Sequence, residues 1–356
     1  MELVNEIVEA RNFWEAWMSV RRNKGAGGID KMSVDALDEY MPLHMDELKQ
    51  SICKKQYKPS PVRRVFIPKP NGKQRPLGIP TVVDRVVQQA TAQVLSRIYE
   101  PLFSDHSYGF RPNRSCHKAI NQALEYLNAG YEWVVDFDIE KYFDTVNHDK
   151  LISILREQVN DSATLHLIRS FLEAGVMEGG LVSATTEGVP QGGCISPILS
   201  NIYLDKLDKE LESRGLRFVR YADDFDIFVK SERSADRVMA SVSHWLESKL
   251  RLKVSATKTK VVRPTKSVFL GFTFWKSTRG WECRPTDVAK EKLETKVKQI
   301  LLRKRASAQP MSYIFTRLNQ IIRGWVNYYH IGSMATYLRD VFGPWMRHKV
   351  RVVIVK

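Results

Sequence analysis

Cysteine is scarce in this chain, with four cysteines among 356 residues. Cys53, Cys116, Cys194 and Cys283 lie far apart, and no two of them have the short spacing that zinc ligands use. The spacing is equally unlike a disulfide framework, which small secreted domains build from closely placed cysteines. The cysteines therefore argue against both kinds of site and favour a reducing compartment.

Long hydrophobic runs are absent as well. A membrane-spanning helix needs about 20 consecutive apolar residues, and no run approaches that length. The first residues, MELVNEIVEARNFWEAW, carry acidic side chains and match neither a signal peptide nor a transit peptide. We therefore expect no membrane association, and a bacterial cytoplasm rather than an organelle.

Acidic side chains are outnumbered by basic ones. Asp and Glu total 40 against 55 Lys and Arg, so the net charge is +15 at pH 7. A protein this basic most often meets nucleic acid or an acidic membrane surface, and the lack of a membrane segment favours nucleic acid. With 43% hydrophobic residues the chain can bury a substantial core, and its length predicts two or three domains.

The local patterns predict an α+β protein. Apolar residues recur at helical spacing through most of the first sixty residues, which a glycine-rich KGAGGID interrupts. Two short extended pieces then flank the turn PNGK, and WVVDFDI and SVFLGFTFWKS are strands by composition. From Pro285 onward the pattern is helical and very basic.

Two acidic positions stand out against this basic background. In WVVDFDI, strand alternation puts Asp136 and Asp138 on one face. In RYADDFDIFV, two β-prone runs flank Asp223 and Asp224, which predicts a hairpin with carboxylates at its tip. If the two elements are neighbours in one sheet, three acids converge, and cations or protons must relieve their repulsion. Mg²⁺ prefers such oxygen ligands, and two ions a few ångströms apart support in-line attack on phosphorus.

Simpler explanations exist for each position taken alone. Asp tolerates the backbone geometry of tight turns, so the Asp223–Asp224 pair could be turn chemistry only. Asp136 could be an ordinary edge residue of its strand. Alternation by itself does not decide between Asp136 and Asp138 as the third acid.

Further segments occur in a fixed order along the chain. They are FWEAWMSVRRNKGAGGID, YKPSPVRRVFIPKPNGKQRPLGIPTVVDRVVQQA, HSYGFRPNRSCHKAI, VVDFDIEKYFDTVNHDKL, GVPQGGCISPILSNIYLDKLD, RYADDF, TKTK, FLGF and LNQIIRGWVNYY. In this order, and over essentially the whole length, the chain resembles the reverse transcriptases of group II introns, also called intron-encoded maturases. The resemblance implies a right-hand polymerase with fingers, an antiparallel palm sheet and a helical basic thumb. It assigns residues 1–60 to a helical N-terminal extension, 61–284 to fingers and palm, and 285–356 to a maturase-type thumb.

The resemblance also implies a metal site. Asp138, Asp223 and Asp224 match the three catalytic aspartates of the family, which hold two Mg²⁺ ions. Asp138 and Asp223 are the expected direct ligands of both ions. Asp136 is then left as a structural neighbour.

Four residues match the family's nucleotide contacts. Lys69 and Arg75 correspond to the fingertip residues that hold the incoming triphosphate, and Lys73 on the same turn is a further candidate. Phe143 corresponds to the bulky residue that excludes a ribose 2′-hydroxyl, which favours deoxynucleotides. Gln191 corresponds to the residue that lies near the sugar, and Gly192 and Gly193 beside it would allow a close backbone approach.

Primer contacts are implied in two places. Phe269, Leu270, Gly271 and Phe272 match the primer grip, although their sequence also fits a plain buried strand. The basic residues of the thumb would follow the backbone of a template–primer duplex; they are Lys290, Lys292, Lys296, Lys298, Arg303, Lys304 and Arg305. Either Lys258 or Lys260 could give a proton to the leaving pyrophosphate, and the sequence does not select between them.

The implied function is synthesis of DNA on an RNA template, and also on DNA, from deoxynucleoside triphosphates and a DNA or RNA primer. Group II intron RNA is the expected partner, with assistance to its splicing and mobility. The chain ends soon after the thumb, at RHKVRVVIVK, so we expect neither the DNA-binding domain nor the zinc-bearing endonuclease of many relatives.

Alternatives to this function stay open. The chain could be a splicing cofactor or RNA chaperone with an inactive polymerase site, or a reverse transcriptase that serves phage defence or repair. An RNA polymerase that uses ribonucleotides is opposed by Phe143. The sequence does not decide between a monomer and a homodimer.

Overall fold

The computed structural model describes residues 2–68, 72, 74–302, 306 and 308–354. It is a mixed α and β structure, as predicted. The chain begins with three helices, α1 (Leu3–Ile7), α2 (Ala10–Asn23) and α3 (Leu37–Cys53). Their buried side chains belong to the same hydrophobic core as those of α4 (Val82–Tyr99), against which α1 and α2 pack. The first sixty residues therefore fold onto the following part of the chain and do not have a core of their own.

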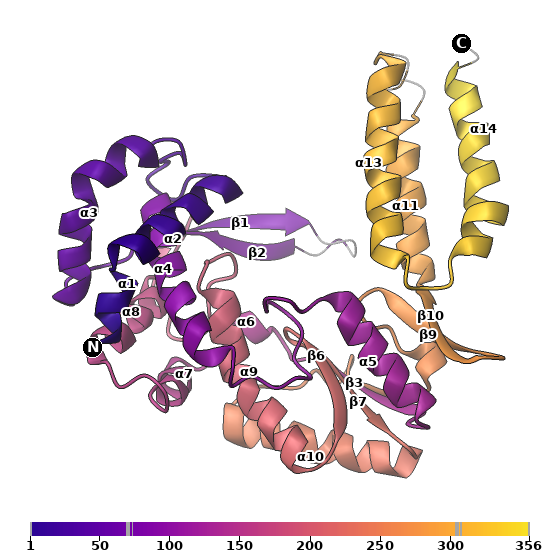
Figure 1. Ribbon diagram of the computed structural model, residues 1–356, viewed down its shortest axis with the longest axis horizontal. Helices are drawn as coiled ribbons and strands as arrows, with labels where there is room; N and C mark the ends of the chain where they lie inside the picture. Colours follow the sequence, from indigo (N-terminus) through magenta and orange to yellow (C-terminus); the bar gives the residue numbers. More distant parts are fainter. Residues whose placement is uncertain (1, 69–71, 73, 303–305, 307, 355–356) are drawn as a thin grey trace.

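A first sheet contains the two extended pieces that flank PNGK. β1 (Val62–Pro68) and β2 (Gln74–Ile79) are antiparallel, with Ile67 opposite Arg75. β4 (Val176–Glu178) adds to β1 in parallel and β5 (Leu181–Ser183) follows, so the strand order is β2-β1-β4-β5. In Figure 1 the β1–β2 pair projects from the body of the molecule toward the C-terminal helices.

The second sheet is antiparallel throughout, with the order β6-β7-β3-β8. Its strands are β6 (Arg217–Tyr221), β7 (Asp224–Val229), β3 (Trp133–Phe137) and β8 (Lys260–Val262). Helix α10 (Glu232–Leu250) packs on β3, β7 and β8, and α5 (Cys116–Asn128) packs on β6 and β7. Both faces of the sheet are therefore covered, which explains why Val134 and Val135 are both fully buried.

Four further helices lie between β3 and β6 in the sequence. They are α6 (Tyr142–Thr145), α7 (His148–Leu155), α8 (Ser162–Glu173) and α9 (Ser196–Ser213). Side-chain caps start two of them, because Asn147 accepts from the Lys150 N–H and Asp161 from the Ala163 N–H, each at 2.9 Å. The loop VPQGG lies shortly before α9.

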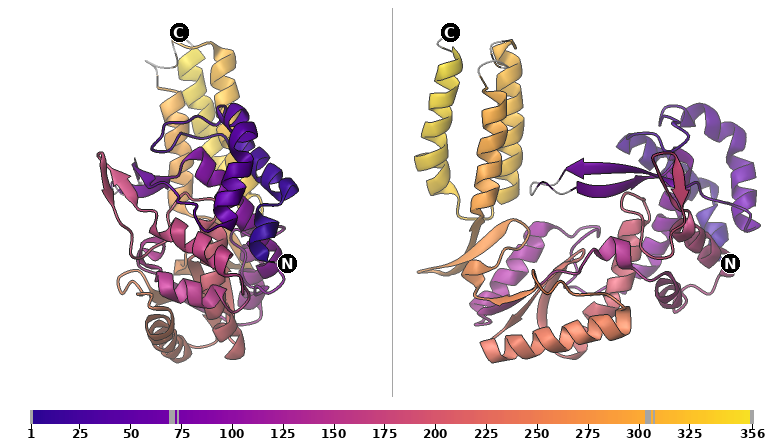
Figure 2. Two further views of the ribbon diagram at one scale, coloured as in Figure 1. Left: turned by 90° about the vertical axis from the view of Figure 1, so that its left-hand side faces the viewer. Right: turned by 180° about the vertical axis from the view of Figure 1, so that it is seen from behind.

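The C-terminal region begins with a two-stranded sheet of β9 (Phe272–Ser277) and β10 (Gly280–Pro285), which η1 (Pro264–Lys266) precedes. Helices α11 (Asp287–Ile300), α13 (Met311–Tyr329) and α14 (Gly343–Ile354) follow, with a π-helical segment, η2 (Tyr337–Phe342), before α14. These helices share a separate core that includes Leu293, Val297, Ile314, Leu318 and Phe342. Figures 1 and 2 show them standing side by side, joined to the rest of the molecule next to β9 and β10.

The strand predicted for SVFLGFTFWKS starts later than expected. Leu270 and Gly271 have φ angles of +51° and +80°, and Phe269 and Phe272 exchange backbone hydrogen bonds across them. A tight turn therefore precedes β9, because positive φ angles are incompatible with an extended strand.

None of the helices that the structure describes is long and apolar enough to cross a membrane.

Candidate active site

The predicted YADD hairpin is present. Tyr221 and Asp224 pair across it, which leaves Ala222 and Asp223 as the two turn residues. Ala222 has a φ of +60°, whereas Asp223 is not among the residues with positive φ. A two-residue hairpin turn needs a residue at positive φ, and here Ala222 takes that position. Turn geometry therefore does not explain why Asp223 is an aspartate.

A buried ion pair between Arg220 and Asp208, which the sequence analysis did not identify, stabilises this turn. Arg220 is fully buried, and its Nε lies 2.7 Å from Oδ1 of Asp208 on α9. The guanidinium also donates to the backbone oxygen of Ala222 at 2.8 Å and to Oδ1 of Asn201 at 3.1 Å. The turn carbonyl is thus held by a guanidinium whose charge is neutralised inside the core. Arg220, placed between Val219 and Tyr221 in the strand RFVRY, was the available sequence signal.

The aspartates of WVVDFDI have different surroundings. Asp138 lies just beyond β3, where its backbone N–H donates to Thr259 Oγ1 at 3.2 Å. Lys258 Nζ lies 2.9 Å from both carboxylate oxygens of Asp138. Asp136 instead lies opposite Asp226 on β7, with Lys260 Nζ 3.4 Å from its Oδ2. The structure therefore separates the two candidate lysines, with Lys258 on Asp138 and Lys260 on Asp136.

The carboxylates lie within electrostatic reach of one another. Burial raises the pKa of Asp223, and the charge of Asp138 raises it further. Reduced solvation also raises the pKa of Asp224 to about 6, although its side chain is still exposed, and the charges of Asp223, Asp136 and Asp138 add to this shift. Such mutual repulsion costs free energy that a bound cation would recover.

A fifth carboxylate, Asp226, lies in the sheet close to these four. It is 1% exposed, with Ser267 Oγ 3.4 Å from its Oδ2. Burial, and then the charges of Asp136 and Asp224, raise its pKa well above the usual range. The sequence analysis missed this acid because it reads as one more residue of the strand that follows Asp224.

The donor set suits a hard divalent cation, since carboxylate oxygens are the ligands that Mg²⁺ prefers. Asp138, Asp223 and Asp224 supply such oxygens from the end of β3 and from the β6–β7 turn. Among the residues that the structure describes, however, no three His, Cys, Asp or Glu side chains stand close enough together to hold a metal ion. In this arrangement Lys258 neutralises Asp138 directly.

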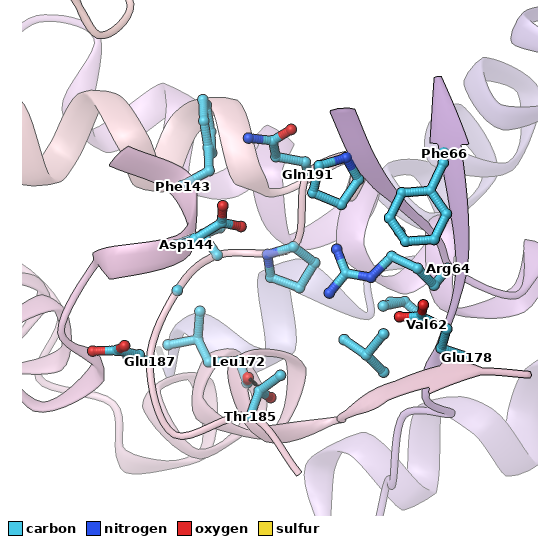
Figure 3. A pocket seen from close by; sticks show the side chains of 16 residues that line it. Val62, Arg64, Phe66, Phe143, Asp144, Leu172, Glu178, Thr185, Glu187 and Gln191 are labelled. Atoms are coloured by element: carbon cyan, nitrogen blue, oxygen red, sulfur yellow. Dashed lines mark hydrogen bonds between the residues drawn. The ribbon is translucent and has the colours of Figure 1, made fainter. Parts of the chain in front are cut away.

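Phe143 and Gln191 line one pocket of about 400 Å³. Figure 3 shows both side chains on its rim, while Arg64 and Phe66 of β1 reach in from the opposite wall. The structure thus brings together two predicted nucleotide contacts that are 48 positions apart in the sequence.

Gly192 has a packing role in the loop beside this pocket. Its φ is +110°, and a Cβ there would lie 2.4 Å from the backbone oxygen of Gly78 on β2. The Gly78 N–H in turn donates to the Gln191 backbone oxygen at 2.7 Å. This glycine therefore allows the loop to dock on β2, a reason that the sequence analysis did not give.

Of the predicted fingertip residues, Arg75 lies within the part of the chain that the structure describes. It is exposed on β2, and its positive charge offsets part of the rise in the pKa of Asp223 that burial causes. The β1–β2 hairpin therefore approaches the acids. Lys69 and Lys73 lie outside the residues that the structure describes.

The predicted primer-grip residues form the turn before β9. Phe269 and Phe272 are 3% and 0% exposed and pack in the core, so only Leu270 and Gly271 are presented at the surface. Helix α13 supports this turn, because the Tyr328 hydroxyl donates to the Leu270 backbone oxygen at 2.9 Å.

Acidic side chains partly compensate the basic residues of the C-terminal helices. Lys290 pairs with Asp287 at 2.9 Å, and Lys298 lies 4.0 Å from Glu294. Lys292 and Lys296 have no carboxylate within 4 Å in the described part of the chain, and they line a groove between α11 and α13. The other predicted members, Arg303, Lys304 and Arg305, lie outside the described residues.

An antiparallel sheet with aspartates at a hairpin turn and at the end of the adjacent strand, in a strongly basic chain, is typical of nucleic acid polymerases. Comparison with known proteins agrees. Residues 67–274 match the family model described as reverse transcriptase (RNA-dependent DNA polymerase), and residues 290–356 match the group II intron, maturase-specific domain. The chain belongs to the reverse transcriptase family and is of the group II intron type, which combines RNA-directed DNA polymerase activity with assistance to RNA splicing.

The chain is also similar to individual proteins. Protein YkfC of Escherichia coli (strain K12) is 35% identical over 290 residues, which cover 70% of this chain and 76% of YkfC. The group II intron-encoded protein LtrA of Lactococcus lactis subsp. cremoris is 29% identical over 414 residues, which cover 90% of this chain and 69% of LtrA. A chain of a solved partial Cas6-RT-Cas1–Cas2 complex matches at 25% identity with a TM-score of 0.44, covering 70% of this chain and 43% of that chain.

Proposed function

We propose that this protein extends a DNA or RNA primer with deoxynucleotides on an RNA template, and also on DNA. In this reaction the primer 3′-oxygen attacks the α-phosphorus of the deoxynucleoside triphosphate, and pyrophosphate leaves. Family membership and the electrostatic coupling of Asp138, Asp223 and Asp224 support the proposal.

Each part of the proposed right-hand polymerase corresponds to one structural unit of the chain. The sheet β2-β1-β4-β5 would form the fingers, and the sheet β6-β7-β3-β8 with its helices would form the palm, within residues 61–284. The helices after Pro285, with their separate core, would form the thumb in residues 285–356. Residues 1–60 would be the N-terminal extension, packed on α4.

Asp138, Asp223 and Asp224 would hold two Mg²⁺ ions. When bound, these ions would supply the Lewis acidity that activates the primer oxygen and steadies the leaving pyrophosphate. Lys258, which contacts Asp138 here, is the better placed of the two lysines to give a proton to pyrophosphate.

The nucleotide would be held by residues from both sides of the site. Arg75, together with Lys69, would bind the triphosphate, since guanidinium and ammonium groups suit phosphate oxygens. Phe143 would lie under the sugar and exclude a 2′-hydroxyl, with Gln191 beside it. Leu270 and Gly271 would present backbone to the primer strand.

The decisive test replaces Asp223 with Asn. Asn keeps the size of the side chain but removes its charge, so we expect Mg²⁺-dependent primer extension on an RNA template to fall at least 100-fold while the thermal unfolding midpoint stays within a few degrees. Asp236→Asn, at an exposed position on α10, is the matched control and keeps full activity. Extension by Asp223→Asn at the wild-type rate would refute the metal assignment.

Intron RNA is the second proposed ligand, supported by the maturase-specific domain of residues 290–356. If RNA binding is separable from synthesis, Asp223→Asn retains wild-type affinity for a group II intron transcript. Loss of both properties together would show that one site serves both.

A further inference from the structure

Hydrogen bonds join two chain segments that carry proposed nucleotide contacts. One is residues 143–148, with Phe143, and the other is residues 188–191, with Gln191. The backbone N–H of Gly188 donates to the Val146 oxygen at 2.8 Å, and that of Val189 donates to the Phe143 oxygen at 2.6 Å. In addition, Nε2 of His148 lies 2.7 Å from the Gly188 oxygen. Because a carbonyl oxygen only accepts, Nε2 carries the hydrogen in this contact.

The approach of the two segments is as close as their backbones allow. Gly188 has a φ of +90°, and a Cβ at this position would lie 2.9 Å from the Phe143 oxygen and 3.0 Å from the Asp144 oxygen. Both neighbours are backbone atoms, which cannot swing aside as the end of a side chain can. Only glycine therefore permits this contact.

His148 lies behind the pocket. It is 4% exposed, begins α7 immediately after the capping Asn147, and is not among the residues that line the cavity. The segments that it joins do line the cavity: Phe143 comes from one and Gln191 from the other (Figure 3). A buried side chain that holds two walls of a pocket at fixed spacing controls the shape of that pocket.

We propose that His148 is a positioning residue for sugar selection, because its bond to the Gly188 oxygen sets the distance between Phe143 and Gln191. This inference rests on the proposed role of Phe143. Without the bond, only the two backbone hydrogen bonds of Gly188 and Val189 hold the segments, so the spacing of Phe143 and Gln191 is less tightly fixed and the pocket accepts a ribose more readily. Small displacements of this kind are costly for reactions that depend on exact positioning.

The test measures kcat/KM for one deoxynucleotide and for the matching ribonucleotide, in single additions to a primer on an RNA template. His148→Leu removes the donor at similar volume, and we expect the deoxy-to-ribo ratio to fall about 10-fold, the size expected when one buried hydrogen bond is lost. His148→Gln presents an amide N–H at similar reach and restores most of the ratio. His166→Leu, at an exposed position on α8, leaves the ratio unchanged.

The ratio separates positioning from a merely structural role. Partial unfolding lowers kcat/KM equally for both nucleotides, so an unchanged ratio in His148→Leu overturns the inference. Phe143→Ala is run in parallel. If it alone lowers the ratio, the sugar gate stands and only the role of His148 is wrong; if neither variant lowers it, the proposed gate is wrong as well.

Discussion

At the scale of single residues, buried carboxylates are the most informative feature of this protein. Several acids of the second sheet and of α9 have raised pKa values because their surroundings solvate the ionised form poorly. For Asp223 and Asp224, the repulsion between neighbouring carboxylates adds to this effect, and the proposed bound cations would relieve it. Burial also raises the pKa of Asp205 on α9, which lies outside the proposed metal site.

Asp205 leads to a prediction about stability and pH. Burial, and then the charge of Asp208, raise its pKa from 3.8 to about 6. The folded state therefore disfavours the ionised form, and this group contributes a loss of stability that grows as the pH rises from about 4 through 6. We expect Asp205→Asn to raise the free energy of unfolding by about 1 to 2 kcal/mol at pH 8, which is below the full value of the shift because the side chain keeps some solvent.

Urea unfolding at pH 8 and near pH 4.5 checks this prediction. The gain should shrink strongly at the lower pH, where the wild-type carboxyl is mostly protonated in the folded state. Asp236→Asn, at an exposed position, should show no gain at either pH. An equal gain for Asp205→Asn at both values would show that its ionisation is not the cause.

At the scale of secondary-structure elements, the β6–β7 hairpin depends on α9. Arg220 and Asp208 are both fully buried, and their pair joins the strand before the YADD turn to this helix. Removing one partner leaves an uncompensated buried charge, which costs far more than the pair itself contributes.

We expect Arg220→Met to lower the free energy of unfolding by about 3 to 5 kcal/mol. The double variant Arg220→Met/Asp208→Leu should lose clearly less than the single variant, because no charge is left alone in the core. Denaturant unfolding of the single and double variants measures the difference. Equal losses in both would show that the hydrogen bonds of Arg220 to Ala222 and Asn201, rather than charge pairing, dominate.

At the scale of the whole molecule, the excess of positive charge is distributed around a small acidic site. The net charge of +15 coexists with five aspartates in and around the second sheet, Asp136, Asp138, Asp223, Asp224 and Asp226. In Figure 1 the β1–β2 pair projects toward the C-terminal helices, and the second sheet lies below both.

Duplex binding should therefore depend on salt through lysines that have no acidic partner. Each phosphate contact contributes about 0.7 to 0.9 to the slope of log K against log salt concentration. We expect Lys292→Gln/Lys296→Gln to reduce the slope for an RNA–DNA duplex by roughly 1.4 to 1.8. Lys209→Gln, whose lysine pairs with Glu212 at 3.4 Å on α9, is the control and should leave the slope unchanged. An unchanged slope in the double variant would place the duplex elsewhere.

The sequence by itself determined the fold class and the candidate acids. The helices of the first sixty residues and of the C-terminal part, the β1–β2 hairpin and the YADD hairpin were predictable because helical and strand periodicities depend on neighbouring residues. The series of motifs along the chain indicated the family, which the comparisons confirmed. The roles of the individual site residues stay proposals.

Only the tertiary structure decided which side chains meet. Lys258 contacts Asp138 across 120 positions of sequence, and His148 contacts Gly188 across 40. Arg220 pairs with Asp208 inside the core. The turn at Leu270 and Gly271 likewise replaced the start of an expected strand, where Tyr328 of α13 donates to the Leu270 backbone oxygen. Local sequence cannot predict such pairings, because each depends on how separate elements pack and on the solvent that packing removes.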